Sequence, residues 1–327
     1  MTYSSGGLIQ AVDYNGFVST TAGANVNDIW ATGATDKGYG QTALATVAAA
    51  GSITAAQWAS LVNTLASMGS HQGTTITART APVAGNTISI LAALNTDLTT
   101  LTTNRGNAAA SGAQFTGWTG TSSKTSATGS GSTAWTITFT HTITWASAAA
   151  ARYFFNAGGR IKWETSKTAD VTAADTEWND LANTLVGDIY ITGGTATQVI
   201  AGTSYTGTTK TGGTGTPNIL LTTTGWYDLL TTDTIIYKQF ADTAPYTGQF
   251  IQISAKTAGS GTQLVLTTVW TDPGGSGAGS SDDISGGTAT TGITFGTAPA
   301  TVVTYFPPST TYLSAAWGTP TVLAATA

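Results

Sequence analysis

The chain has 327 residues, of which only 8% are charged, and its formal net charge is −5. Roughly a quarter of the residues in soluble proteins are charged, so the polar surface of this chain must consist largely of Thr, Ser, Asn and Gly. Lysine and arginine total 11, which argues against a nucleic-acid binder. With 10 Trp, 11 Tyr and 9 Phe, the chain can bury a substantial core, which excludes a disordered protein.

The chain contains no cysteine, which favours synthesis in a reducing compartment. Residues 1–8 lack the basic and apolar regions of a signal peptide. No run approaches the roughly 18 apolar residues that a membrane helix needs. We therefore expect a protein that is made in the cytoplasm without export and that has no membrane partner.

The first third of the chain carries helical patterns. Thr54 and Gln57 form the signature of a capping box, in which each side chain satisfies a backbone N–H of the other residue. Apolar residues then recur at helical spacing and predict a helix that ends near Gly69. The apolar stripe of this helix comprises Trp58, Leu61, Val62, Leu65 and Met68.

A second helix is expected over residues 86–104. It is followed by Arg105 and Gly106, a cation and a glycine at positions that a helix C-terminus favours. We expect the two apolar stripes to pack on each other or on the same helices of neighbouring copies. Shorter helical pieces are expected between residues 14 and 30. The stripe of the second helix comprises Ile90, Leu91, Leu94, Leu98 and Leu101.

The composition changes after these helices, because residues 108–132 are rich in Gly, Ser, Thr and Ala. We place a domain boundary near Ser111, between a helix-containing assembly region, residues 1–111, and a β domain, residues 112–327. The clearest strand pattern lies at residues 135–145, WTITFTHTITW. Its even-numbered positions are all Thr, and its odd-numbered positions are apolar apart from one His. This period of two predicts a strand with one apolar face and one threonine face.

Most of the remaining chain predicts short strands between Gly, Ser and Thr turns. A hairpin is expected at residues 152–163, with two aromatic-rich strands around residues 156–159. One short helix at residues 174–185 and a glycine-rich loop at residues 273–287 interrupt the strands. The fold class is therefore mainly β, an antiparallel β-sandwich-like domain preceded by a small α-helical N-terminal region. The other expected strands are residues 188–192, 218–222, 234–240, 249–255, 263–270 and 301–306.

Residues that could carry chemistry are few, and the chain has only two histidines. His141 lies on the apolar face of the long predicted strand, so we interpret it as a core or interface residue. His71 follows the first long helix, where a capping or turn role fits best. The two histidines are not spaced as metal ligands, and the chain has no cysteine. Both facts argue against a zinc site or a redox-metal site. No Gly-x-Ser-x-Gly turn supports a Ser-His-Asp triad.

Carboxylates are also scarce. A pair for glycoside cleavage would have to come from Glu164, Glu177 and scattered aspartates. Asp282 and Asp283 could bind calcium weakly but lack the spaced oxygen ligands of an EF-hand. One local cluster of acids is interpreted as N-terminal residues of the short helix, where they favour the helix dipole. The cluster comprises Asp170, Asp175, Glu177 and Asp180.

Two further patterns are candidate binding sites. The glycine-rich residues 212–216 are preceded rather than followed by Lys210, so they are interpreted as a turn and not as a phosphate-binding loop. A set of aromatic residues could form a stacking platform for sugar rings, although such residues more often anchor strands in a core. We therefore expect no catalytic residue, no cofactor and no metal site. The aromatic set is Trp118, Trp226, Tyr227, Tyr246 and Trp317.

Three parts of the chain carry a recognisable pattern: residues 38–73, with GYGQ at the start and HQG at the end; residues 151–161, ARYFFNAGGRI; and residues 308–320, with PSTTY and WGTP. Each resembles a recurring segment of tailed-bacteriophage virion proteins, which are described as structural, tail-fibre or fibre-like components. Together the segments are distributed from the first part of the chain to the last, so the resemblance is not confined to one domain. Within residues 38–73, the matching positions also include Leu44, Val47, Ile53, Thr54, Gln57, Trp58 and Leu61.

The resemblance implies a non-enzymatic virion structural protein, a multi-copy tail or fibre-like appendage component. Such proteins commonly form homotrimers in which leucine stripes pack around a threefold axis. The expected partners are other copies of the chain, other virion proteins and, through exposed loops, a host-surface glycan. The alternative is a capsid decoration (cement) protein that stabilises the head shell. A surface-polysaccharide depolymerase ranks third, because it would need an acidic cleft and this chain has few carboxylates.

Overall fold

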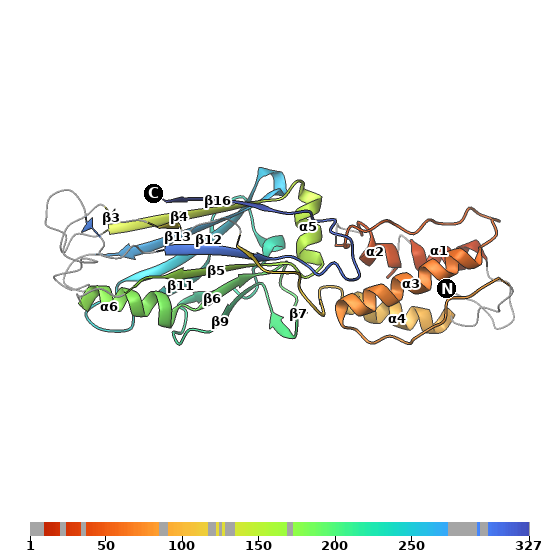
Figure 1. Cartoon of the computed structure of the whole chain (residues 1–327), viewed down its shortest axis with the longest axis horizontal. Helices are drawn as coiled ribbons and strands as arrows, with labels where there is room; N and C mark the ends of the chain where they lie inside the picture. Colours follow the sequence, from red (N-terminus) through yellow and green to blue (C-terminus); the bar gives the residue numbers. More distant parts are fainter. Residues whose placement is uncertain are drawn as a thin grey trace.

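The computed structural model describes residues 10–19, 24–33, 37–84, 91–116, 122–123, 126–127, 135–168, 173–273, 293–294 and 300–326. The molecule is elongated, with the N-terminal helices at one end and two β-sheets beyond them (Figure 1). The two sheets contain six strands each, and all strand pairs within them are antiparallel. The predicted class, an antiparallel sandwich preceded by a small helical region, is confirmed.

The helical region contains α1 (Ala11–Val18), α2 (Val26–Trp30), α3 (Ala55–Gln72) and α4 (Leu91–Thr103). The capping box at the start of α3 is confirmed: the Thr54 hydroxyl accepts the Gln57 N–H at 3.2 Å, and Gln57 Oε1 accepts the Thr54 N–H at 2.8 Å. The predicted end of α3 at Gly69 is wrong. The helix continues to Gly73, which adopts the left-handed conformation (φ 66°) that terminates helices most readily.

Replacing Thr54 with alanine should lower the free energy of unfolding by about 1 kcal/mol, because the Gln57 N–H loses its capping oxygen. Urea denaturation followed by circular dichroism measures this difference. Ser60→Ala, at an exposed position in the middle of α3, is the control and should be neutral or slightly stabilising. Equal destabilisation by both variants would contradict the role assigned to the cap.

The apolar stripes of α3 and α4 pack on each other within one chain, which is one of the two alternatives expected from the sequence. Their described side chains are at most 5% exposed, so these residues do not form a surface around a threefold axis. The side chains of residues 90 and 91 lie outside the description. The buried members of the two stripes are Trp58, Leu61, Val62, Leu65, Met68, Leu94, Leu98 and Leu101.

The first sheet has β15 (Ala300–Phe306) near its centre. Its order is β1 (Phe115–Thr116), β15, β5 (Arg160–Ser166), β6 (Asp188–Ile191) and β9 (Thr208–Thr211), and β2 (Ser122–Ser123) also pairs with β15. The second sheet runs β10 (Ile219–Leu220), β11 (Thr234–Phe240), β12 (Phe250–Ala258), β13 (Gln263–Asp272), β4 (Trp135–Thr144) and β16 (Thr321–Thr326). Two small pairs are β3 (Ser126–Ala127) with β14 (Ile293–Thr294) and β7 (Gln198–Ile200) with β8 (Thr203–Tyr205).

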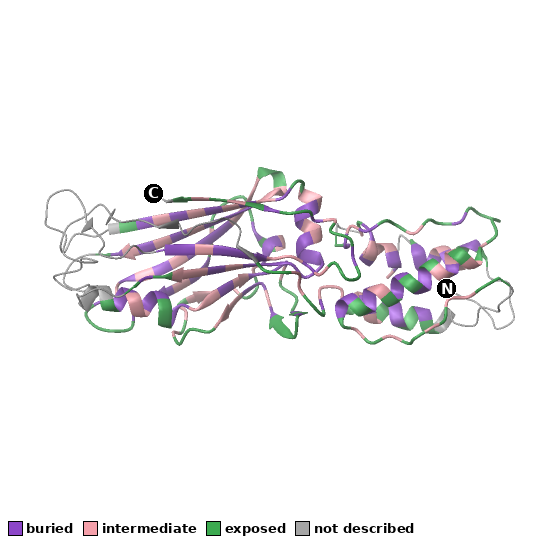
Figure 2. Ribbon diagram, viewed as in Figure 1, coloured by how far each residue is buried: buried purple, intermediate pink, exposed green. Residues whose placement is uncertain are grey.

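The long threonine-rich pattern forms the single strand β4, as predicted. Ile137, Phe139, His141 and Ile143 are fully buried, whereas the intervening threonines are exposed or half-buried. The side chain of Trp135 lies outside the description. Figure 2 shows this alternation along the strands. Phe139 faces Thr268 across the β4–β13 ladder. The Trp163 indole of the opposite sheet donates a hydrogen bond to the Thr268 hydroxyl at 2.8 Å, so the two sheets meet here in a dry core.

The other predicted strands are all present, with their ends shifted by a few residues. The predicted short helix forms as α6 (Ala173–Asp180), continued by a π-helical turn, η2 (Leu181–Leu185). Four further strands, β7, β8, β9 and β16, are not evident from the sequence, because these short segments lack clear alternation of apolar and polar residues. Most of the predicted loop at residues 273–287 lies outside the described residues.

The predicted hairpin at residues 152–163 is wrong in its first half. Residues 148–156 form the helix α5 (Ala148–Asn156), and only the second half is a strand, β5. Ser147 caps α5 by accepting the Ala150 N–H at 3.0 Å, and the alanine run that follows has the highest helix propensity. Phe154 and Phe155, both fully buried, pack into the core from one side of this helix. The aromatic residues therefore reflect a buried helix face and not a strand.

Candidate functional site

Residues from the three segments 38–73, 151–161 and 308–320 meet at the junction between the helical region and the sandwich. Tyr39, from the GYGQ segment, is fully buried, and its ring meets that of His71 edge to face at 5.2 Å. The Tyr39 hydroxyl donates to the Arg105 carbonyl at 2.6 Å and accepts from Gln72 Nε2 at 2.9 Å. These contacts fix the loop before α3 to the ends of both α3 and α4.

The other segments complete the junction from the sandwich side. His71 Nε2 lies 3.1 Å from the Ala157 carbonyl, which can only accept, so this nitrogen carries the proton. Asn156 Nδ2 donates to the Gly38 carbonyl at 2.8 Å. Gln41 pairs with the backbone of Ser314 in both directions, at 3.0 and 2.8 Å. Hydrogen bonds from two regions of the sandwich, residues 156–157 and Ser314, therefore hold the helical region in place.

Both histidines are buried, as predicted for His141, and burial lowers the pKa of each to about 4. A backbone hydrogen bond opposes the effect of burial on the pKa in each case, to Ala157 for His71 and to Thr301 for His141. The turn or capping role expected for His71 is only partly right. It lies in the last turn of α3, but its side chain points into the junction.

Stability should fall as the pH is lowered from about 6.5 to about 4. In this window the histidines of the unfolded chain bind protons while the folded pKa, about 4, keeps both residues neutral. The expected loss is up to about 3 kcal/mol per histidine and is complete below the folded pKa. Urea midpoints measured from pH 7.5 to pH 4 test this. His71→Leu and His141→Leu should each flatten the dependence, whereas an unchanged slope in both variants would contradict it.

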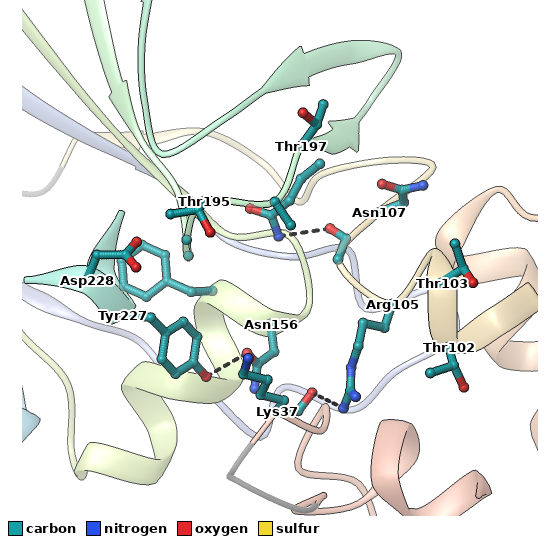
Figure 3. Close-up of a pocket in the computed structure, with 16 residues that line it drawn as sticks. Lys37, Thr102, Thr103, Arg105, Asn107, Asn156, Thr195, Thr197, Tyr227 and Asp228 are labelled. Atoms are coloured by element: carbon teal, nitrogen blue, oxygen red, sulfur yellow. Dashed lines mark hydrogen bonds between the residues drawn. The ribbon is translucent and has the colours of Figure 1, made fainter. Parts of the chain in front are cut away.

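A cleft of about 300 Å³ opens beside this junction. Its wall comes from the loop at Lys37, the end of α4, the end of α5, the loop before β7 and the 3₁₀ turn Trp226–Asp228. Figure 3 shows the side chains of these five segments around one central space. The lining includes Lys37, Arg105, Asn156, Gln198, Tyr227 and Asp228.

Two polar side chains at the cleft have unused hydrogen-bonding atoms. Gln198 is 7% exposed and donates through Nε2 to the Gly106 carbonyl at 3.0 Å, but its buried Oε1 has no partner among the described residues. Arg105 binds Asp28 Oδ2 at 3.0 Å and the Lys37 carbonyl at 2.9 Å through its terminal nitrogens. Its buried Nε likewise lacks a partner within the described chain. Buried polar atoms are seldom left unpaired, so these two atoms depart from ordinary packing.

The opposite wall is aromatic and rigid. The Tyr227 hydroxyl donates to Asn156 Oδ1 at 2.7 Å, which orients the ring beside the cleft. The ammonium group of Lys37 lies 5.9 Å from the centroid of the Tyr227 ring. Asp228 caps the 3₁₀ turn by accepting the Gly225 N–H at 3.0 Å. The cleft is thus lined by a fixed ring, three amide side chains and three charged groups. The amides are Asn107, Asn156 and Gln198, and the charged residues are Lys37, Arg105 and Asp228.

The acidic residues of the short helix do not lie where the sequence predicts. Glu177 lies in the second half of α6 and Asp180 at its end, so the interpretation as helix N-terminal acids is wrong for both. Their oxygens lie within 4.8 Å of a carboxylate oxygen of Asp242, the one grouping in the described part of the chain that could hold a metal ion. Burial raises the pKa of Glu177. The tertiary structure therefore brings together acids that are distant in sequence.

The expected sugar-stacking set is mostly buried. Trp226, Tyr246 and Trp317 are at most 9% exposed and act as core anchors, whereas Tyr227 lines the cleft. The predicted positions Trp118, Asp170, Asp282 and Asp283 lie outside the described residues, as does the side chain of Asp175. Glu164 contacts Lys162 on β5 and is not part of the acidic group.

The cleft is not visible in the sequence. Asn156 ends α5, Gln198 begins β7 and Lys37 lies on a loop, and no spacing connects these polar residues. Among the described helices, none combines the length and hydropathy needed to cross a membrane. Comparison of the chain with protein-family models, with curated proteins and with solved structures finds no match.

Proposed function

We propose that this chain is a non-enzymatic virion structural protein, a multi-copy tail or fibre-like appendage component of a tailed bacteriophage. The observation that supports this most is the convergence of the three resembling segments at one junction. Tyr39, His71 and Ala157 come from two of them and lie in contact there, and Gln41 reaches Ser314 in the third. Residues that are distant in sequence thus serve one purpose, the rigid attachment of a helical base to a β-sandwich.

The surface of the sandwich supports the same proposal. β4 turns a row of threonines away from the core, and the edge strand β16 contains no charged residue. Edge strands of soluble proteins usually carry charges or proline, which prevent pairing with other chains. Leu323 on β16 is 72% exposed. A neutral edge of this kind suits a chain that assembles with other copies or with other virion proteins.

A capsid decoration protein is the second candidate. The leucines of α3 and α4 whose side chains are described, Leu61, Leu65, Leu94, Leu98 and Leu101, are buried inside the chain, so these side chains are not free to pack around a threefold axis. This favours a chain that is monomeric in solution and assembles only on the particle.

The mass of the purified protein, measured by light scattering, distinguishes these two candidates. A trimer that resists detergent is the result expected for an appendage component. A monomer would favour the decoration protein. Mass spectrometry of purified particles tests the common part of the proposal, because absence of the chain from the particle would refute both roles. Copies in the hundreds per particle would indicate decoration, and a few dozen at most would indicate an appendage.

A further inference from the structure

The second sheet ends in an edge strand that is regular along its whole length. In the described part of the chain, β16 is hydrogen-bonded to a strand on one side alone, to β4, and it lies along an outer edge of the sandwich (Figure 1). In such a strand, alternate residues direct their N–H and C=O groups away from the sheet. The register with β4 is continuous from Thr321 to Thr326, so no bulge turns the edge away. β16 is therefore a template on which one more strand can form.

The other sheet edges that the structure describes are protected against such pairing. β1, β2 and β10 contain two residues each, and β9 carries Lys210. Short length and lysine are two devices by which proteins prevent their edge strands from pairing with other chains. β16 has six residues, none of them charged and none of them proline. One long unprotected edge beside several protected ones indicates a strand that pairs with a partner.

The side chains of β16 suit a second copy of the same strand. When two copies pair antiparallel about a twofold axis at Leu323, the two leucines lie opposite each other, and Thr321 of each copy lies opposite Ala325 of the other. These three side chains are all exposed, and Leu323, at 72%, is the most exposed large apolar side chain among the described residues. Self-pairing brings identical residues together at the axis, where like charges would destabilise the pair. A strand without charges avoids this cost.

We propose that β16 pairs with β16 of a second copy, antiparallel and with Leu323 at the twofold axis, so that the second sheets of two chains become continuous. The inference rests on the proposed function for its setting, because a multi-copy component holds its chains close together and so raises the effective concentration for this pairing. The contact joins chains two by two. It adds to any threefold contact and does not replace it.

Cysteine cross-linking tests both the pairing and its register, since the chain has no cysteine of its own. Leu323→Cys should form a disulfide-linked dimer with oxidised glutathione. Opposite residues of an antiparallel pair have Cα atoms about 4.5–5.5 Å apart, within the disulfide range of about 4.4–6.8 Å. Thr321→Cys alone should not cross-link, because its two copies would lie four residues apart along the strand, about 14 Å. A mixture of Thr321→Cys and Ala325→Cys should give the mixed dimer. Non-reducing electrophoresis of the full-length protein measures the yields.

The matched control is Leu230→Cys, at a leucine that is 67% exposed in the loop before β11. It reports the dimer yield that random collision gives at an equally exposed position. Circular dichroism checks that each variant is folded. Equal yields from Leu323→Cys and Leu230→Cys, or a Thr321→Cys dimer that forms as readily as the Leu323→Cys dimer, would overturn the proposal.

Leu323→Lys tests the pairing without a covalent bond. It places two ammonium groups opposite each other at the axis and should raise the dissociation constant of self-association at least about tenfold. Analytical ultracentrifugation over a concentration series measures this constant, and Leu230→Lys should leave it unchanged. Absence of self-association in the unmodified chain, or an equal effect of the two lysine variants, would contradict the edge contact.

The two proposals fail separately. A Leu323→Cys dimer of a chain that is absent from purified particles would refute the virion role and leave the edge pairing intact. Particles that contain the chain, together with no specific Leu323→Cys dimer, would refute the edge pairing alone. Leu323→Lys also gives the mass of the chain without the edge contact, and this is the mass to compare with the trimer and the monomer of the light-scattering test.

Discussion

Phe139→Asp should abolish the soluble fold. The Phe139 side chain is fully buried between the sheets, and the centroid of its ring lies 6.4 Å from that of the Trp270 ring. An aspartate here would place a carboxylate in an apolar environment without a partner, at a cost of several kcal/mol. This is comparable with the whole stability of a typical domain, about 5–15 kcal/mol. The fraction of soluble protein after expression and the urea midpoint of any soluble protein measure the effect.

The matched control is Thr140→Asp, which adds the same charge one residue away. Thr140 lies on the opposite face of β4 and is only half-buried, so the new carboxylate can remain hydrated. We expect a change within about 1 kcal/mol. Normal folding of Phe139→Asp would show that the assignment of faces on β4 is wrong.

Asp97→Ala should destabilise the helical region by about 3–5 kcal/mol. Asp97 on α4 forms an ion pair with Arg79, and the two side chains are only 8% and 7% exposed. Asp97 Oδ1 also accepts the Thr77 N–H at 3.3 Å. Removing the carboxylate leaves a buried guanidinium without its counter-charge, which is the costly way to break such a pair. Hydrogen exchange of the α4 peptide and urea denaturation report the loss.

Two comparisons isolate this effect. Asp233→Ala breaks the ion pair between Asp233 and Lys256, two side chains that are 47% and 31% exposed. It should lower the free energy of unfolding by at most about 1 kcal/mol. The double variant Arg79→Met with Asp97→Leu removes both charges and should recover much of the stability lost in Asp97→Ala. If the double variant is as unstable as the single one, shape and not charge explains the loss.

Local patterns in the sequence were sufficient where one element carries its own signal. The alternation along residues 135–145 predicted β4 and the burial of His141, because the period of a strand assigns each side chain to a face. The capping box at Thr54 fixed the start of α3 in the same way. The strand predicted over the aromatic run at residues 153–155 is wrong. Aromatic residues favour strands on average, but here Phe154 and Phe155 line the buried face of a helix that Ser147 and the alanines initiate.

The sequence by itself determined a charge-poor surface, the two strand faces of β4 and the helices that precede the sandwich, because these follow from composition and from periods of two or 3.6 residues. Only the tertiary structure decided which distant residues meet. It placed Gln198 and Arg105 at one cleft, brought Asp242 to Glu177, and used the leucine stripes within a single chain. Contacts of this kind depend on how sheets and helices pack across long sequence separations. No local pattern encodes that packing, and so the candidate site became visible only in the folded chain.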